Sequence, residues 1–179
     1  GKSYSKGGRQ VSTSDYFRDQ HGNINRDYQR ESEYTRMLGD HIVERYHADG
    51  IVLPSHLVSY AAFGMLEKTF PNNDLYALLR LPAEDFYFDR DGLHSVVEQL
   101  RDRLLLLNKE DNAKLSQELY DSPEEIVRQG IATLGNFHID KPLRYDKEDR
   151  IVCDNFAMLH YYHNRLSTFY LKRYVNWPV

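Results

Sequence analysis

The stretch 53–66, LPSHLVSYAAFGML, decides the fold because it is apolar on nearly every face of a helix. Pro54 and Ser55 favour a helix start, since both suit the first turn. Apolar side chains then recur at helical spacing until Phe70-Pro71 ends the pattern; they are Leu57, Val58, Ala61, Ala62, Met65 and Leu66. A helix without a polar face must be covered all round, so we expect this one in the core.

Two helices are predicted next to this central one. Before it, residues 27–48 repeat an apolar side chain every four positions with charged residues between, and Gly50 ends the pattern. After it, we expect a short helix to follow Asn73 or Asp74 and to stop before Pro82. The polar and aromatic residues 84–89 are then expected to form a loop.

The second half of the chain carries the signals of three more helices. A long one is predicted from its cap, Asp91, to Leu107. Ser122-Pro123-Glu124-Glu125 joins a cap residue, a proline and two carboxylates at the positive end of the helix dipole, which predicts a helix to about Leu134. The last helix is predicted over residues 154–174, with its first residue, an aspartate, as the cap.

The pattern changes over residues 137–152, where flanking apolar residues and a charged turn at 146–149 predict a β-hairpin. The predicted fold class is therefore mainly α, a helical bundle with one small hairpin. Three helices followed by a hairpin also match a winged-helix module, and the alternative function is therefore a module of this type that binds protein or nucleic acid. Residues 1–8 predict an isolated strand and loop before the bundle. A lone strand lacks a partner, so we expect that the chain was cut from a longer protein.

Composition excludes several classes of function. The net charge of -4 and pI of about 6.1 show no excess of Lys and Arg, so we expect no nucleic-acid partner. Cys153 is the only cysteine, which leaves no intrachain disulfide or multi-cysteine zinc site and suits a reducing, cytoplasmic compartment. Apolar runs such as 104–107 are far shorter than the roughly eighteen residues of a membrane span. We expect a soluble fragment whose membrane contact, where it exists, is peripheral.

No catalytic, metal or cofactor site is predicted from residue chemistry. His160 and His163 share a helical face but have no nearby carboxylate or cysteine to complete a metal site. His138 and Asp140 are expected on one face of a strand and are interpreted as ordinary surface residues. The chain has no glycine-rich nucleotide loop, no nucleophile elbow and no base beside Cys153. An independent enzyme built from distant histidines and tyrosines is the least supported possibility.

The most unusual stretch is Leu159-His160-Tyr161-Tyr162-His163-Asn164-Arg165-Leu166. One interpretation is a core helix whose aromatic face is buried. The other is an interface or membrane-surface helix, because Tyr and Arg combine apolar area with polar tips. The candidate interface residues are Tyr161, Tyr162, His163, Asn164 and Arg165.

Tyr161, Tyr162 and Asn164 resemble the Tyr-Tyr-Arg-Asn segment near the end of bacterial and mitochondrial glycerol-3-phosphate acyltransferases, with His163 in place of its Arg. Residues 1–17 are similar to the segment after that family's catalytic domain, a strand, Phe-Gly-Glu-Pro and a short helix. Gly8 and Asp15-Tyr16-Phe17 fit it, whereas Arg9-Gln10 stand where Glu-Pro is expected. Two helical stretches agree as well, around 38–46 and at Leu53-Pro54-Ser55-His56-Leu57-Val58.

The resemblance implies a linker from a missing acyltransferase domain at 1–26 and a helical accessory domain at 27–179. Family members use a His-x4-Asp motif to accept the proton of the sn-1 hydroxyl of glycerol 3-phosphate. None of the eight histidines has an Asp five positions on, so this chain is expected to be inactive by itself. The implied partners are the parent's acyltransferase domain, a membrane surface or an acyl carrier protein. The implied location of the parent is peripheral, on the cytoplasmic side of a membrane.

Overall fold

The computed structural model describes residues 18, 21–23, 28–82 and 86–178. The chain divides into two compact units, residues 1–47 and 48–179, and each is considered separately. The strand expected at 1–8 and the Asp15-Tyr16-Phe17 segment lie outside the described residues. Helix α2 (Tyr28–Asp49), most of which belongs to the first unit, confirms the helix predicted over 27–48.

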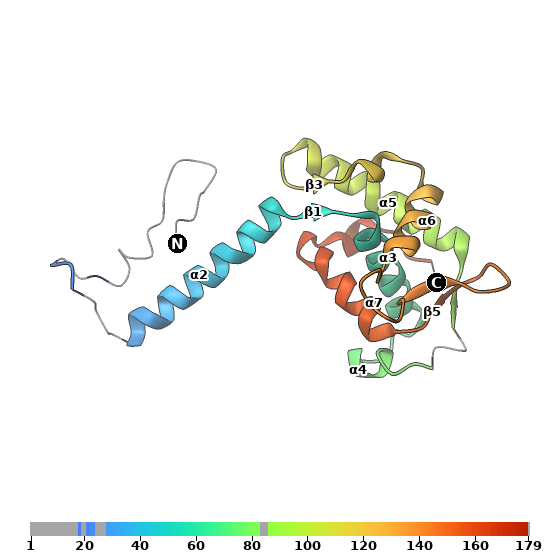
Figure 1. Ribbon diagram of the computed structural model, residues 1–179, viewed down its shortest axis with the longest axis horizontal. Helices are drawn as coiled ribbons and strands as arrows, with labels where there is room; N and C mark the ends of the chain where they lie inside the picture. Colours follow the sequence, from blue (N-terminus) through green and yellow to red (C-terminus); the bar gives the residue numbers. More distant parts are fainter. Residues whose placement is uncertain (1–17, 19–20, 24–27, 83–85, 179) are drawn as a thin grey trace. The chain divides into compact units, whose positions relative to one another are not determined.

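The second unit is built around helix α3 (Pro54–Thr69), which buries twelve of its sixteen residues. Helices α5 (Arg90–Lys109), α6 (Pro123–Thr133) and α7 (Phe156–His163) all pack against it (Figure 1). Tyr60 and Phe63 are the largest of its fully buried side chains. Each buried apolar side chain of this kind contributes roughly 1.5–3 kcal/mol, so the burial of α3 is a large contribution to the stability of this unit. The predicted central position of this helix is confirmed.

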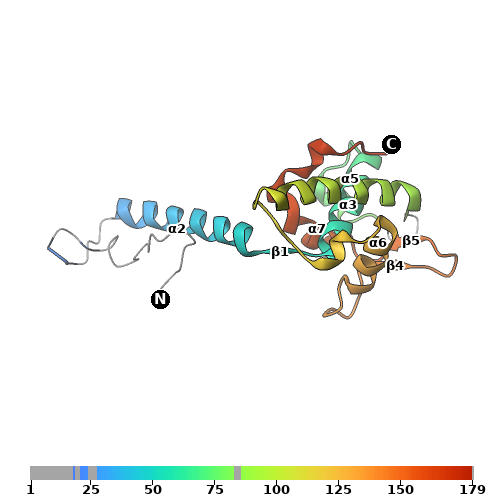
Figure 2. The same cartoon turned by 90° about the horizontal axis from the view of Figure 1, so that it is seen from above.

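Shorter elements connect these helices (Figure 2). They are β1 (Ile51–Val52), α4 (Leu75–Leu78), β2 (Tyr87–Phe88), β3 (Lys114–Leu115), the 3₁₀ helix η2 (Gln117–Tyr120), β4 (Leu143–Tyr145), β5 (Ile151–Cys153), and the 3₁₀ helices η3 (Asn164–Phe169) and η4 (Leu171–Tyr174). Helix α4 follows its cap Asp74, whose carboxylate accepts a hydrogen bond from Ala77 N at 2.8 Å.

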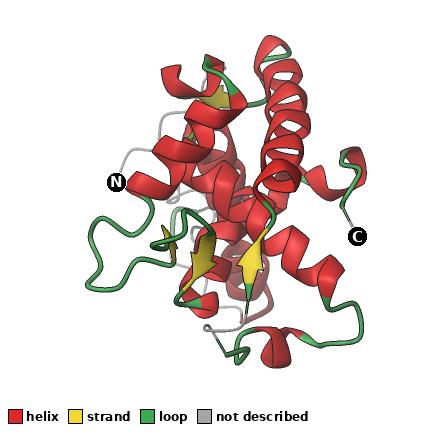
Figure 3. Cartoon of the chain, turned by 90° about the vertical axis from the view of Figure 1, so that its right-hand side faces the viewer, coloured by secondary structure: helices red, strands yellow, loops and turns green. Residues whose placement is uncertain are grey.

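A small antiparallel sheet has the strand order β2-β5-β4, and a separate parallel pair joins β1 to β3. Figure 3 shows how short these strands are among the helices. The order of α3, β2, α5, α6, β4 and β5, with the first strand beside the last, is the connectivity of a winged helix. The expectation that 84–89 is a loop was wrong, because Tyr87 and Phe88 pair with β5. Two residues are too few to show an alternating pattern.

The hairpin is shorter than predicted. Its strands pair Leu143 with Cys153 and Tyr145 with Ile151 around the expected charged turn. The sequence predicted a strand in which Phe137 and Ile139 alternate with His138 and Asp140. Phe137 and Ile139 instead lie in turns and are 98% and 103% exposed. Gly135, with φ +74°, turns the chain at the end of α6 and separates these residues from the sheet.

Two helix caps differ from the prediction by one or two positions. Asp89 Oδ2, not Asp91, accepts the capping hydrogen bond, from Gly92 N at 2.7 Å. At α7 the cap is Asn155, whose Oδ1 accepts from Met158 N at 2.9 Å. Asp154 instead holds Arg144 through two hydrogen bonds, so its carboxylate is already occupied. Adjacent capping residues compete, and the sequence alone does not rank them.

The single long helix predicted over 154–174 was also wrong. Helix α7 ends at His163, and the chain continues as η3 and η4. Tyr170 separates these with a left-handed backbone, φ 51° and ψ 39°, which a continuous α-helix does not allow. This turn lets Leu166 and Leu171 both reach the core, and buried packing therefore outweighs helical continuity.

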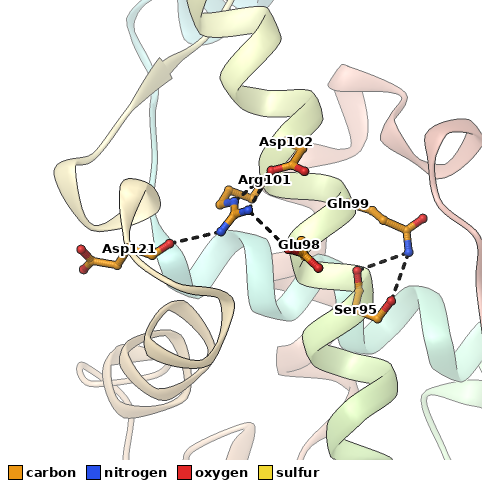
Figure 4. Close-up of polar contacts among 6 residues, drawn as sticks. All are labelled: Ser95, Glu98, Gln99, Arg101, Asp102 and Asp121. Atoms are coloured by element: carbon orange, nitrogen blue, oxygen red, sulfur yellow. Dashed lines mark hydrogen bonds and ion pairs between the residues drawn. The ribbon is translucent and has the colours of Figure 1, made fainter.

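The connection between α5 and α6 is held by Arg101 of α5 (Figure 4). Its Nη1 donates to the carbonyl of Asp121 at 3.3 Å, and its Nε and Nη2 donate to Asp102 Oδ1. The Arg101 side chain is mostly buried, whereas its carboxylate partners Glu98 and Asp102 are exposed. This bridge fixes the chain one residue before Ser122, whose Oγ accepts from Glu125 N and caps α6 as predicted.

Candidate functional site

An open cavity of about 470 Å³ lies where the start of α3 meets α7, α6 and the loop after α6. It is therefore formed by segments about a hundred residues apart in the sequence. The lining residues are Leu53, Pro54, Ser55, His56, Glu118, Gln129, Thr133, Asn136, Phe137, His138, Tyr161, Tyr162 and Arg165. The volume is typical of a site for a small molecule or for one anchoring side chain of a partner.

The first turn of α3 forms one wall of this cavity. Leu53 N donates to His56 Nδ1 at 3.3 Å, so the neutral imidazole carries its proton on Nε2. Burial, and then the positive charge of Arg165, lower the pKa of His56 to about 4. His56 is therefore neutral at physiological pH. It offers an N–H donor, not a positive charge.

The opposite wall comes from the C-terminal aromatic segment. Arg165 Nη2 donates to Tyr161 Oη at 3.3 Å, and its guanidinium lies 5.7 Å from the centre of that ring. The rings of Tyr161 and Tyr162 meet edge to face at 5.4 Å, and Tyr162 meets His138 in the same way at 6.1 Å. These contacts orient the two tyrosines and Arg165 as one group.

The five interface candidates from the sequence do not all lie on one surface. Tyr161, Tyr162 and Arg165 line the cavity, but His163 and Asn164 do not. His163 is only 5% exposed, and its ring stacks on Tyr60 with centres 4.7 Å apart and planes 8° from parallel. Asn164 lies beside it, with Oδ1 3.3 Å from His163 Nδ1. The core interpretation holds for His163, whereas Tyr161 is largely exposed and the interface interpretation stays a prediction.

His163 borders a second cavity of about 420 Å³, together with Tyr60, Ser167, Tyr170, Lys172 and Arg173. Burial is the main cause that lowers the pKa of His163 to about 4, followed by the charge of Lys172. Its Nε2 is buried and has no hydrogen-bond partner among the described residues. Lys172 is held outside by an ion pair with Glu67.

The residues of acid–base or nucleophilic chemistry are poorly placed for catalysis. Cys153 is fully buried in β5, and burial raises the pKa of its thiol to about 12, so no thiolate forms near neutral pH. His160 and His163 do share a face, but their rings stack at 5.7 Å. Across the described ranges, no three His, Cys, Asp or Glu side chains are grouped to hold a metal ion. No helix in those ranges is long and apolar enough to cross a membrane.

Sequence reasoning missed that Ser55, His56, Glu118 and Phe137 belong to the same site as the tyrosines. The signal for Ser55 and His56 was present, because both fall within the helix start at Leu53-Pro54 that was already singled out. Glu118 and Phe137 lie in short irregular segments, and only the folded chain brings them to the cavity.

Comparisons with known proteins do not assign this chain to a family. Protein-family models, curated protein sequences and solved structures all gave no match. Functional inference therefore depends on the residues and on the geometry of the cavity.

Proposed function

We propose that this chain is a non-catalytic accessory domain of a glycerol-3-phosphate acyltransferase, and that the surface around the cavity docks on the acyltransferase domain of the parent. The parent transfers an acyl group from acyl-CoA or acyl carrier protein to the sn-1 hydroxyl of glycerol 3-phosphate. It works at the cytoplasmic face of a membrane, where the surface around the cavity also has access to lipid or to the carrier protein.

One observation carries the proposal. The two helical-domain segments that most resemble the family, Leu53-Pro54-Ser55-His56 and Tyr161-Tyr162, are far apart in sequence but line the same cavity. The rim of the cavity is also suited to a partner, because two aromatic lining residues are exposed, Tyr161 by 55% and Phe137 by 98%. Tyr and Arg on a half-buried aromatic surface are typical of protein interfaces.

The chemistry of the described residues agrees with an accessory role. The sequence has no His-x4-Asp motif, its one thiol is buried, and the histidines with lowered pKa stack on aromatic rings or bind backbone. Acyl transfer therefore requires a catalytic base that the parent supplies elsewhere.

The test is acyl transfer to glycerol 3-phosphate, from both donors, by the intact parent and by this chain alone. We expect activity in the parent only. In the parent, Tyr161→Ala should lower activity at least about tenfold, since an interface anchor contributes on the order of 2 kcal/mol. Tyr76→Ala is the matched control, because Tyr76 is also an exposed tyrosine but lies on α4, outside the cavity. Activity of the isolated chain, or equal loss in both variants, would contradict the proposal.

A winged-helix interaction module is the second candidate, favoured by the connectivity of the second unit. The recognition helix of a winged-helix module directly precedes its hairpin, and in this chain that helix is α6. The charged side chains of α6 are Glu124, Glu125 and Arg128, and Arg128 is paired with Glu125 at 2.5 Å. This helix carries no excess positive charge for phosphates, so the candidate is a module that binds protein. Retention of the isolated chain on immobilised duplex DNA at physiological salt would reverse that choice.

A further inference from the structure

The cavity between the start of α3 and the aromatic segment gathers hydrogen-bond donors that have no partner among the described residues. Ser55 is only 7% exposed, lines the cavity, and neither its hydroxyl nor its backbone N–H has a hydrogen-bond partner within the described ranges. His56 carries its proton on Nε2, which likewise has none there. Ser55 Oγ and His56 Nε2 are not fully buried atoms, so they face the open cavity and are free to donate to a ligand that enters it.

Arg165 adds a positive charge on the opposite wall. Arg128, Arg144 and Arg150 each hold a carboxylate, at 2.5 to 2.8 Å. Arg165 has only the hydroxyl of Tyr161 at 3.3 Å, and no carboxylate of the described residues is within ion-pair distance of it. The positive end of the sixteen-residue helix α3 points to the same place, because Ser55 and His56 lie in its first turn.

We propose that this cavity binds a phosphate monoester with an apolar or aromatic body. Arg165, His56 Nε2, Ser55 Oγ and Ser55 N offer donors from two opposite walls, which suits the three terminal oxygens of a phosphate better than the two oxygens of a planar carboxylate. The remaining walls, from Leu53, Pro54, Phe137 and the tyrosines, suit the organic part.

Glu118 is the one carboxylate in the lining, and it opposes an anion. It lies on η2, and its own backbone N–H lowers the pKa of its carboxyl group, so it stays ionised. Glu118→Gln should therefore bind the phosphate more tightly than the natural chain, because the variant removes the repulsion between the carboxylate and the phosphate.

The phosphate site shares its cavity with the proposed docking surface, but it is tested by ligand binding instead of acyl transfer, so the two proposals can fail separately. The probe is phenyl phosphate, titrated into the full chain by calorimetry and by NMR of the His56 imidazole; phenol and inorganic phosphate are the comparison ligands. We expect phenyl phosphate to bind in the millimolar range or tighter, and phenol not to bind. The phosphate should raise the pKa of His56, since an anion favours the imidazolium.

Variants separate this site from general attraction by positive charge. Arg165→Gln should weaken phenyl phosphate binding at least about tenfold, as expected for a charge-assisted hydrogen bond. Arg165→Lys should bind phenyl phosphate with an affinity between those of the natural chain and Arg165→Gln, because lysine keeps the positive charge but lacks the planar guanidinium group. Arg173→Gln is the matched control: its guanidinium lies over Tyr174 as that of Arg165 lies over Tyr161, but outside this cavity.

Ser55→Ala should weaken binding several-fold while keeping the backbone donor and the helix. The emission of Trp177, the only tryptophan, checks that each variant is folded. No binding of phenyl phosphate, equal binding of phenol, or equal losses in Arg165→Gln and Arg173→Gln would each overturn the proposal.

Discussion

Helix α3 and the C-terminal segment 156–178 lie against each other, but they depend on their sequences in different ways. Helix α3 is apolar on nearly every side and is buried over most of its length. The C-terminal segment alternates buried and exposed residues: Leu159, His163, Leu166 and Leu171 point inward, while Tyr161 and Tyr170 are largely exposed. A segment that must serve both a core and a surface changes from α7 to η3 and η4 to do so.

A helix that is buried on nearly every side can be predicted from its own pattern, whereas a segment that forms both core and surface cannot. In α3 the apolar periphery and the burial agree, so local and tertiary preferences coincide. In the C-terminal segment the aromatic residues are compatible with either side of a helix. The partner α3 decides which of them are buried, and the left-handed Tyr170 is the result.

Shortening a side chain of α3 is expected to have the largest effect on stability. Phe63 is fully buried and contacts the rings of His160 and His163, at 4.8 and 5.0 Å between centres. Phe63→Ala should lower the free energy of unfolding by about 3–5 kcal/mol, from lost burial and the cavity left behind. Urea unfolding followed by circular dichroism measures it. Tyr76→Ala, at an exposed position, should stay within about 0.5 kcal/mol, and a similar loss in both would contradict the central role of α3.

Most of the helical framework was predictable because its signals are local. The start of α6 at Ser122-Pro123 and the short helix after Asp74 each rest on a cap that the structure retains. The cap of α5 moved from Asp91 to Asp89, because two aspartates stand near one helix start and only geometry selects between them. Strand β2 was missed because its two residues become a strand only by pairing with β5.

The site was predictable only in part. Tyr161, Tyr162 and Arg165 were identified, since their aromatic and basic character is unusual in the sequence. The opposite wall was not, because Ser55 and His56 are ordinary residues of a helix start until the fold places them beside Arg165. Spatial clusters built from distant segments have no sequence spacing to detect. His163 was placed with the surface residues, whereas its ring is stacked inside on Tyr60.

Acid should destabilise the contact between α3 and the C-terminal segment through His163. Its pKa is about 4 in the folded chain and 6.5 when unfolded, because burial and the nearby charge of Lys172 disfavour the imidazolium. Between those values the unfolded state binds more protons, so stability is lost as pH falls from about 6.5 to about 4. The loss from this residue is on the order of 3 kcal/mol at the low end.

His163→Phe should remove that part of the acid sensitivity and keep the stacking on Tyr60 and Phe63. The variant also removes the buried Nε2 that has no partner in the described part of the chain, so stability at pH 7 should be equal or higher. His56 keeps its own lowered pKa, and some acid sensitivity therefore remains. Urea midpoints measured from pH 7 to pH 4 give the comparison. An unchanged slope with pH would mean that His163 is protonated in the folded chain.

The smallest expected effect concerns the place where the end of the chain lies on α3. A Cβ added at Gly64 would overlap the indole ring of Trp177, whose Nε1 donates to the carbonyl of Lys172 at 3.0 Å. Gly64→Ala should therefore displace the indole, shift its emission to longer wavelength and cost about 1–3 kcal/mol, since overpacking offsets the better helix propensity of alanine. Gly39→Ala in α2 has open space around the new methyl group and should leave the emission unchanged. If Gly64→Ala also leaves it unchanged, the C-terminal segment does not depend on α3 for its position, and the contrast between the two regions no longer holds.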